Sequence, residues 1–136
     1  MGGSDSDTLR GGDGDDTLIG VDETLVTPGI GERDILIGDA GADVFVLGDE
    51  DGTFYDDGAT VVSEGWAGRA VVRNFEVDTD TIQLFAGGSY ELQERNGHTR
   101  IWEVSDPVRE LIAIVRDAID LDLEGSEFTF VWFDEP

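Results

Sequence analysis

The sequence predicts an all-β protein, in which a short parallel β-roll of nonapeptide repeats is followed by an antiparallel capping β-sheet or sandwich. Glycine falls at positions 2, 11, 20, 29 and 38, a strict nine-residue spacing, and apolar residues keep the same phase. Beyond the repeats, short segments of alternating polarity flank an Asn96-Gly97 pair, which is a strong signal for a β-hairpin. The length of 136 residues suits one domain, or two small domains that share a core.

Residues 2–46 divide into five nonamers: GGSDSDTLR, GGDGDDTLI, GVDETLVTP, GIGERDILI and GDAGADVFV. Glycine gives the tight turn of each nonamer the backbone angles that it needs. The last three residues form a short strand whose middle side chain points inward. That eighth position is apolar in four of the five nonamers, as Leu9, Leu18, Leu36 and Phe45. We expect successive turns to stack as a parallel coil, with two nonamers in each revolution.

The sixth position of four nonamers is an aspartate, namely Asp7, Asp16, Asp34 and Asp43. Carboxylate and carbonyl oxygens would face one another across stacked turns, which suits a hard cation that takes about six to eight oxygen ligands. The pattern GGxGxDxUx is a calcium-binding β-helix repeat, and GGDGDDTLI matches it at every specified position. On these motifs the chain resembles the RTX family (repeats-in-toxin, or haemolysin-type calcium-binding proteins).

The RTX resemblance implies that two or more Ca²⁺ ions bind to the four aspartates and their neighbours. The neighbours expected to contribute, several through backbone carbonyls, are Gly3, Asp5, Gly11, Gly12, Asp13, Gly14, Gly38 and Ala40. Four further acidic residues lie in a glycine-bounded loop after the repeats and are weaker candidates: Asp49, Asp51, Asp56 and Asp57. Asp78 and Asp80 are weaker candidates too, since they also suit a hydrogen-bonded turn.

Two registers of the coil are open, because the third nonamer has no carboxylate at its sixth position. If all five nonamers coil, Asp16 stacks on Asp34. If residues 23–31 instead form a loop insertion, Asp7 stacks on Asp34. Asp16 then stacks on Asp43, and two complete sites result. A Thr-Pro-Gly sequence inside that range is typical of a turn and favours the loop.

The strongly acidic charge of the chain favours a bound cation and disfavours anionic partners. Residues 1–57 contain 16 acidic residues and two arginines, and the whole chain has a net charge of −24. A compact coil with this charge repels itself without counter-ions, so we expect Ca²⁺ binding to supply folding free energy. Nucleic acid and anionic membranes should be repelled. An anionic polysaccharide would need a bridging Ca²⁺ or a local arginine patch. No apolar run approaches the ~20 residues of a membrane span.

The domain prediction is a calcium-binding roll over residues 1–47 and a β-rich cap over residues 48–136. Strands are expected at 70–75, 80–85, 90–95, 98–104, 110–115 and 128–133. The sequence VRNFEVDTDTIQL is similar to the segment that begins the capping sheet in many RTX proteins. The same resemblance implies a type I secretion signal within the cap. The candidates for an exposed, glycan-binding aromatic surface are Phe54, Tyr55, Trp66, Trp102 and Trp132. The alternation in RIWEV and FVWF favours a core or cap position for most of them instead.

No catalytic residue set is predicted. The single histidine, His98, lies beside the expected hairpin turn, and Asp106-Pro107 is a weak candidate for self-cleavage. The predicted function is a non-catalytic, calcium-binding structural module of a secreted, extracellular protein, whose parent protein could be an enzyme. Met1 directly before the first repeat suggests a piece of a longer chain. The resemblance implies export by the type I secretion machinery. The alternative is a calcium-dependent glycan- or cell-surface-binding module.

Overall fold

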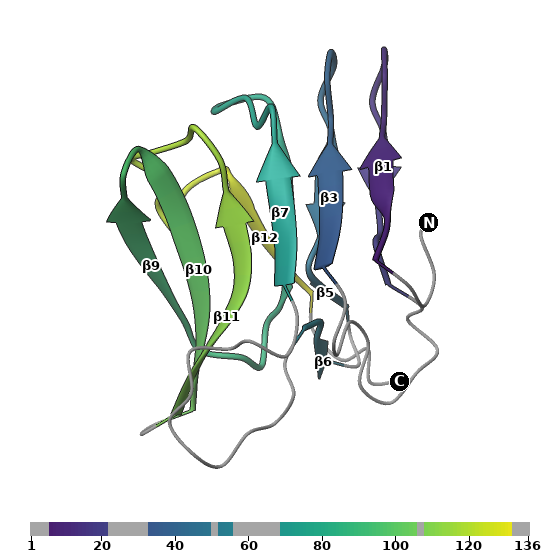
Figure 1. Ribbon diagram of the computed structural model, residues 1–136. Coiled ribbons are helices and arrows are strands. Elements are labelled where there is room, and N and C mark those ends of the chain that lie inside the picture. Colours follow the sequence, from purple (N-terminus) through teal and green to yellow (C-terminus); the bar gives the residue numbers. More distant parts are fainter. Residues whose placement is uncertain (1–5, 22–32, 50–51, 56–68, 106–107, 132–136) are drawn as a thin grey trace.

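A computed structural model describes residues 6–21, 33–49, 52–55, 69–105 and 108–131. These ranges contain twelve strands and no helix. The strands form one sheet of six, one of four and one of two (Figure 1). The predicted all-β fold class is therefore confirmed. Within the same ranges, no helix is long and apolar enough to cross a membrane.

The six-stranded sheet is parallel over one part and antiparallel over the other. Its order is β1 (Thr8–Arg10), β3 (Arg33–Ile37), β7 (Arg69–Arg73), β11 (Val108–Val115), β10 (His98–Ser105) and β9 (Tyr90–Arg95). The first four strands pair in parallel, and β11, β10 and β9 pair antiparallel. The hairpin between β9 and β10 turns at Asn96 and Gly97, whose φ angles are 55° and 81°, as an Asn-Gly hairpin turn requires.

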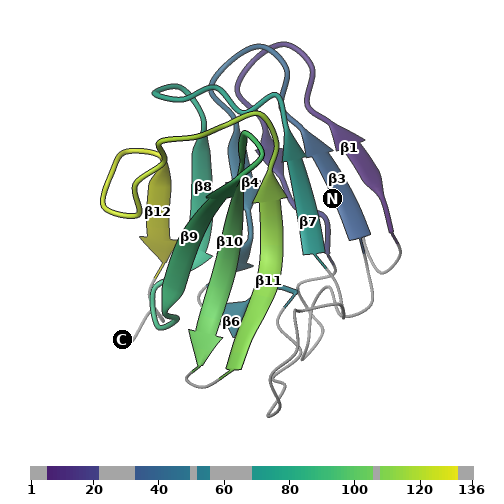
Figure 2. The ribbon, with the colours of Figure 1, turned by 60° about the vertical axis from the view of Figure 1, so that its left-hand side comes forward.

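The four-stranded sheet is parallel throughout. Its order is β12 (Phe128–Val131), β8 (Thr81–Phe85), β4 (Val44–Val46) and β2 (Thr17–Leu18). Figure 2 shows this sheet behind the six-stranded one, as a second layer. Two short strands, β5 (Gly48–Asp49) and β6 (Gly52–Thr53), pair antiparallel.

The chain coils by passing repeatedly from the six-stranded to the four-stranded sheet. It does so from β1 to β2, from β3 to β4, from β7 to β8 and from β11 to β12. Both sheets therefore contain strands from residues 1–47 and from residues 48–136. The antiparallel pairing expected of the cap is found in β9, β10 and β11. The division into two domains at residue 47 remains a prediction.

The core lies between the two sheets and is built on the eighth position of the repeats. Leu18, Leu36 and Phe45 are 5%, 0% and 0% exposed. The next revolution of the coil adds one inward residue to each sheet, because Leu36 is paired with Val72 in the six-stranded sheet and Phe45 with Ile82 in the four-stranded sheet. The inward direction predicted for this position is confirmed at these three residues.

The aromatic candidates that the structure describes are buried, so they do not form an exposed glycan-binding surface, and the core position that alternation favours for Trp102 is confirmed. Phe54 and Tyr55 are each 1% exposed, and Trp102 is 6% exposed. Phe54 and Tyr55 belong to the main hydrophobic core, since the short segment that carries them folds inward after β6. Trp66 and Trp132 lie outside the described residues.

Candidate metal centre

The strand register brings the four repeat aspartates together in two pairs. Thr8 is paired with Ile35 and Thr17 with Val44, a separation of 27 residues in each case. The backbone N–H of Asp7 donates to Asp34 Oδ1 at 2.8 Å, and the N–H of Asp16 donates to Asp43 Oδ1 at 2.9 Å. Of the two registers that the sequence leaves open, the structure thus has the one with pairs 7/34 and 16/43. The insertion expected at 23–31 lies outside the described residues.

Two edges of the coil carry these aspartates. The first edge consists of the turns 11–16, 38–43 and 74–80, which lead from the six-stranded to the four-stranded sheet. There the N–H of Asp43 in turn donates to Asp80 Oδ1 at 2.8 Å, so that Asp16, Asp43 and Asp80 form a continuous ladder. The second edge lies at the start of β1 and β3 and carries Asp7 and Asp34.

Side chains at the preceding position of the repeat strengthen both edges. The N–H of Arg33 donates to Ser6 Oγ at 2.9 Å, and the N–H of Ala42 donates to Asp15 Oδ1 at 2.8 Å. These bonds run in the opposite direction to the aspartate bonds, from the later turn back to the earlier one. Two hydrogen bonds of opposite direction therefore hold residues 6–7 in register with 33–34, and two more hold residues 15–16 in register with 42–43.

Three carboxylate oxygens at these edges are buried without a hydrogen-bond partner among the described residues. They are the Oδ2 atoms of Asp7, Asp16 and Asp43. Asp43 is only 1% exposed as a residue. A buried polar group without a partner costs about 1–3 kcal/mol, and a charged one costs more. Such oxygens are what a bound cation would satisfy.

Glycines at the first position of the repeat leave room beside these oxygens. A Cβ atom at Gly11 would lie 2.7 Å from Asp16 Oδ2, and one at Gly38 would collide with Asp43 Oδ2. A Cβ atom at Gly41 would collide with the carbonyl oxygen of Gly14 in the adjacent turn, which shows how closely the two turns stack. Only glycine at these positions keeps the carboxylates and carbonyls this close.

Burial dominates the electrostatics of the buried aspartates. Desolvation raises the pKa of Asp43 above its usual value, the N–H of Asp16 opposes that rise, and the neighbouring carboxylates of Asp80, Asp16 and Asp15 add to it. Desolvation also raises the pKa of Asp34, while the hydroxyl of Tyr55 and the N–H of Asp7 act in the opposite direction. A cation beside either carboxylate would favour the charged form.

The residues present fit a Ca²⁺ ion held largely by backbone oxygens. Within the described ranges, no three His, Cys, Asp or Glu side chains form a group that could hold a metal ion. Carbonyl oxygens of the turns 11–16 and 38–43 would therefore have to join Asp16 and Asp43. Hard cations accept such mixed oxygen sets. Gly11, Gly12, Asp13, Gly14, Gly38 and Ala40 belong to these two turns, and Gly3 and Asp5 lie outside the described residues.

Two other carboxylates of the same edges are satisfied by the protein itself. Asp80 Oδ2 accepts from the N–H of Glu76 at 2.8 Å. Asp34 Oδ2 accepts from the hydroxyl of Tyr55 at 2.7 Å. The Asp80 bond spans four residues within one turn and agrees with the hydrogen-bonded turn expected there. The Tyr55 bond depends on how the segment after β6 folds back onto the coil, which the sequence does not indicate.

The remaining candidates are not members of the ladder, or they lie outside the described residues. Asp49 is in β5, and Asp78 is an exposed turn residue with a φ of 70°. Asp51, Asp56 and Asp57 lie outside the described residues, as does Asp106-Pro107.

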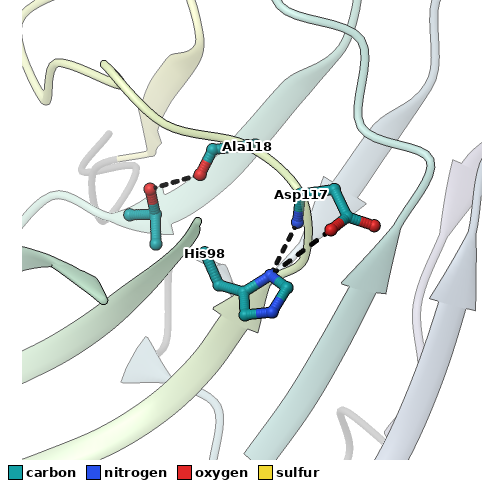
Figure 3. Close-up of polar contacts among 4 residues, drawn as sticks. His98, Asp117 and Ala118 are labelled. Atoms are coloured by element: carbon teal, nitrogen blue, oxygen red, sulfur yellow. Dashed lines mark hydrogen bonds and ion pairs between the residues drawn. The ribbon is translucent and has the colours of Figure 1, made fainter. Parts of the chain in front are cut away.

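His98 is the first residue of β10 and does not belong to either edge that carries the repeat aspartates. Its Nδ1 accepts from the N–H of Asp117 at 2.8 Å (Figure 3). The hydroxyl of the next residue, Thr99, donates to the carbonyl of Ala118 at 2.7 Å. The two bonds fasten the segment after β11 to the start of β10.

Comparison with known families agrees with this geometry. A family model described as the RTX calcium-binding nonapeptide repeat matches the chain in four copies, over residues 1–21 and 30–54. The gap between the two matched stretches falls within and just after the nonamer that has no sixth-position carboxylate. No curated protein matches the chain. The resemblance inferred from the repeats is confirmed.

Proposed function

Because the repeats at 1–21 and 30–54 are those of the RTX calcium-binding family, we propose that this chain is a calcium-triggered folding module of a secreted protein. In this role it binds Ca²⁺ at the edges of the coil, folds outside the cell, and supports the type I export and stability of its parent. The role is structural, and the module itself is non-catalytic.

The observation that carries the proposal is the set of buried oxygens without partners on Asp7, Asp16 and Asp43. Without a cation, folding would bury these carboxylates inside a chain of net charge −24. With Ca²⁺, the same groups become ligands, and the free energy of ion binding becomes free energy of folding. Low cytoplasmic calcium would therefore keep the chain loose before export, and high external calcium would fold it.

Calcium titration followed by far-ultraviolet circular dichroism tests the folding part. We expect little β structure in a chelator, a cooperative gain of β signal with Ca²⁺, and no comparable gain with Mg²⁺, which demands a smaller octahedral site. Isothermal titration calorimetry gives the number of ions. The same β signal in chelator and in calcium would refute calcium-triggered folding.

Export needs a separate experiment, because a calcium-binding module need not be secreted. The full chain, expressed with a type I secretion system in a Gram-negative host, should appear in the medium. Omission of the transporter is the control and should abolish its appearance. Retention of the chain in the cell with the system present would refute the export part and leave calcium-triggered folding intact.

A further inference from the structure

A pocket on the six-stranded sheet gathers most of the positive charge of this acidic chain. Its volume is about 330 Å³, and its lining includes five arginines and the single histidine: Arg33, Arg69, Arg95, Arg100, Arg116 and His98. The chain has eight arginines, no lysine and a net charge of −24. Five of eight positive charges at one place is a concentration that the calcium-binding edges do not explain.

The pocket opens on the outer face of the sheet. Along β7, Ala70 and Val72 are buried in the core, so the alternating residues Arg69 and Val71 lie on the opposite face. Strand pairing places Arg33 beside Arg69, and Ile114 between Val71 and Arg100. Val71 and Ile114 thus form a short apolar row with arginines around it.

The arginines lie close enough to repel one another. The pKa of Arg69 is lowered first by burial and then by the charges of Arg33 and Arg100. Among the residues that the structure describes, no acidic side chain forms an ion pair with Arg33, Arg95, Arg100 or Arg116; the arginine ion pair found there joins Arg10 to Asp39. Like charges side by side on a sheet are destabilising, and an anion between them would reverse that cost.

We propose that this pocket binds a small ligand that carries a carboxylate, sulfate or phosphate group. The planar guanidinium group presents its N–H donors in a fork that matches such oxyanions, which a lysine ammonium does not. The apolar row of Val71 and Ile114 offers a surface for the carbon skeleton of the ligand. His98 adds a donor: its Nδ1 accepts from Asp117, so the neutral ring carries its proton on Nε2.

The charge of the rest of the molecule favours a small ligand over a long polyanion. A nucleic acid or an anionic membrane would extend beyond the pocket and meet a surface that is strongly negative overall. Electrostatic repulsion is screened only beyond about 10 Å at 0.1 M salt. A ligand confined to the pocket avoids most of that repulsion and keeps the attraction of the arginines.

Binding of two anions by the full chain in calcium tests the proposal. The probes are sulfate, as a bare oxyanion, and glucuronate, as a sugar carboxylate, with glucose as the uncharged control. We expect at least one anion to bind, with glucose inert. Tighter binding of glucuronate would assign the apolar row to a sugar ring, and binding of sulfate alone would assign a simple oxyanion site. Binding of neither anion overturns the proposal.

Arginine variants locate the binding. Arg100→Gln and, separately, Arg116→Gln should weaken binding by roughly tenfold or more, since each removes a charge-assisted hydrogen-bond donor. Arg73→Gln is the matched control, because Arg73 lies on the same face of β7 but does not line the pocket. Melting curves in calcium confirm that each variant folds. An equal loss in Arg73→Gln would show a diffuse charge effect and would overturn the assignment to this pocket.

Discussion

Asp43 and Asp80 are neighbours in one ladder, yet they differ at the Oδ2 atom. Each accepts a backbone N–H at Oδ1 from the preceding turn. Asp43 Oδ2 has no partner within the described residues, whereas Asp80 Oδ2 accepts from the N–H of Glu76. The turn that ends at Asp80 lies between β7 and β8 and is one residue longer than the turn between β3 and β4. The longer turn supplies a donor to the oxygen that stays without a protein donor in the turn of Asp43.

At the second edge, too, a protein donor satisfies the aspartate Oδ2, and there the donor is a side chain. Asp34 Oδ2 accepts from the hydroxyl of Tyr55, which is 1% exposed and has a φ of 63°. A bulky residue in this left-handed conformation costs about 1–3 kcal/mol, and the surrounding structure must hold it there. The comparison teaches that an Oδ2 atom in this coil is either satisfied by a protein donor, as at Asp34 and Asp80, or left open for an ion, as at Asp43.

Replacing Asp43 should have the largest effect. Asp43→Asn removes a charged ligand, and we expect the calcium affinity to fall about tenfold to a hundredfold, with the roll failing to fold at moderate calcium. In chelator the variant should be no less stable than the parent chain, because a buried charge has been removed. Calcium titrations by circular dichroism and calorimetry measure the first effect. Because little of the chain is expected to fold in chelator, refolding by trimethylamine N-oxide in chelator measures the second.

Asp80→Asn is the matched control. The amide keeps one acceptor oxygen but loses the other, so stability should fall by about 1–3 kcal/mol in calcium and in chelator alike. The number of bound ions should not change. If both variants lost calcium equally, the distinction between the two carboxylates would be wrong.

The close stacking of the RTX turns predicts the next largest effect. Gly41 has a φ of 106°, and a Cβ atom there would collide with the Gly14 carbonyl. Gly41→Ala should therefore cost more than the ~1–2 kcal/mol of the left-handed conformation alone, because the turns must separate. Gly12→Ala has a similar φ of 83° but meets nothing within 4 Å, so it should show the conformational cost only. Urea unfolding in calcium measures the difference, and equal losses would refute close stacking.

Tyr55→Phe tests the second edge with a smaller change. The ring remains in the core, but Asp34 Oδ2 loses its donor, and we expect a loss of about 1–3 kcal/mol in chelator. The loss should shrink in calcium if the freed carboxylate can then bind an ion. A loss of equal size in both conditions would show that Tyr55 cannot be replaced by a cation.

The sequence predicts the repeat turns better than it predicts how they end. The nonamer period identifies Asp16, Asp43 and the inward Leu36, because turn chemistry and strand alternation are local properties. It leaves the register open, since pairing across 27 residues depends on where the intervening nonamer goes. It gives no sign that β7 and β12 continue the coil, because the spacing of glycine and aspartate is lost there. The bond from Glu76 to Asp80 is local and agrees with the expected turn, whereas the hydroxyl of Tyr55 reaches Asp34 only when the chain folds back onto the coil.

The slope of stability against pH should have opposite signs in the calcium-free and calcium-bound chains. The contribution of each carboxyl group to this slope is the smallest of the effects predicted. Burial raises the pKa values of Asp34 and Asp43 above the ordinary 3.8, so in the absence of calcium the folded state binds protons more tightly than the unfolded state. Their contribution is complete below about pH 3.8 and is lost as the pH rises through the folded pKa values, by at most about 1.4 kcal/mol per pH unit for each group.

With calcium bound, the carboxylates serve as ligands in their charged form, and acid must displace the ion. Stability should then fall as the pH is lowered through the same range, which is the opposite slope. Acid also reduces the net charge of −24 in both conditions, so the chain-wide repulsion needs its own control. Asp43→Asn supplies it: the variant keeps the general charge effect but should lose the part of the calcium-free slope that comes from Asp43. Urea midpoints in calcium and trimethylamine N-oxide refolding midpoints in chelator, each measured against pH, give the two slopes. Slopes of the same sign in both buffers would mean that the buried carboxylates are not the groups that the ion satisfies.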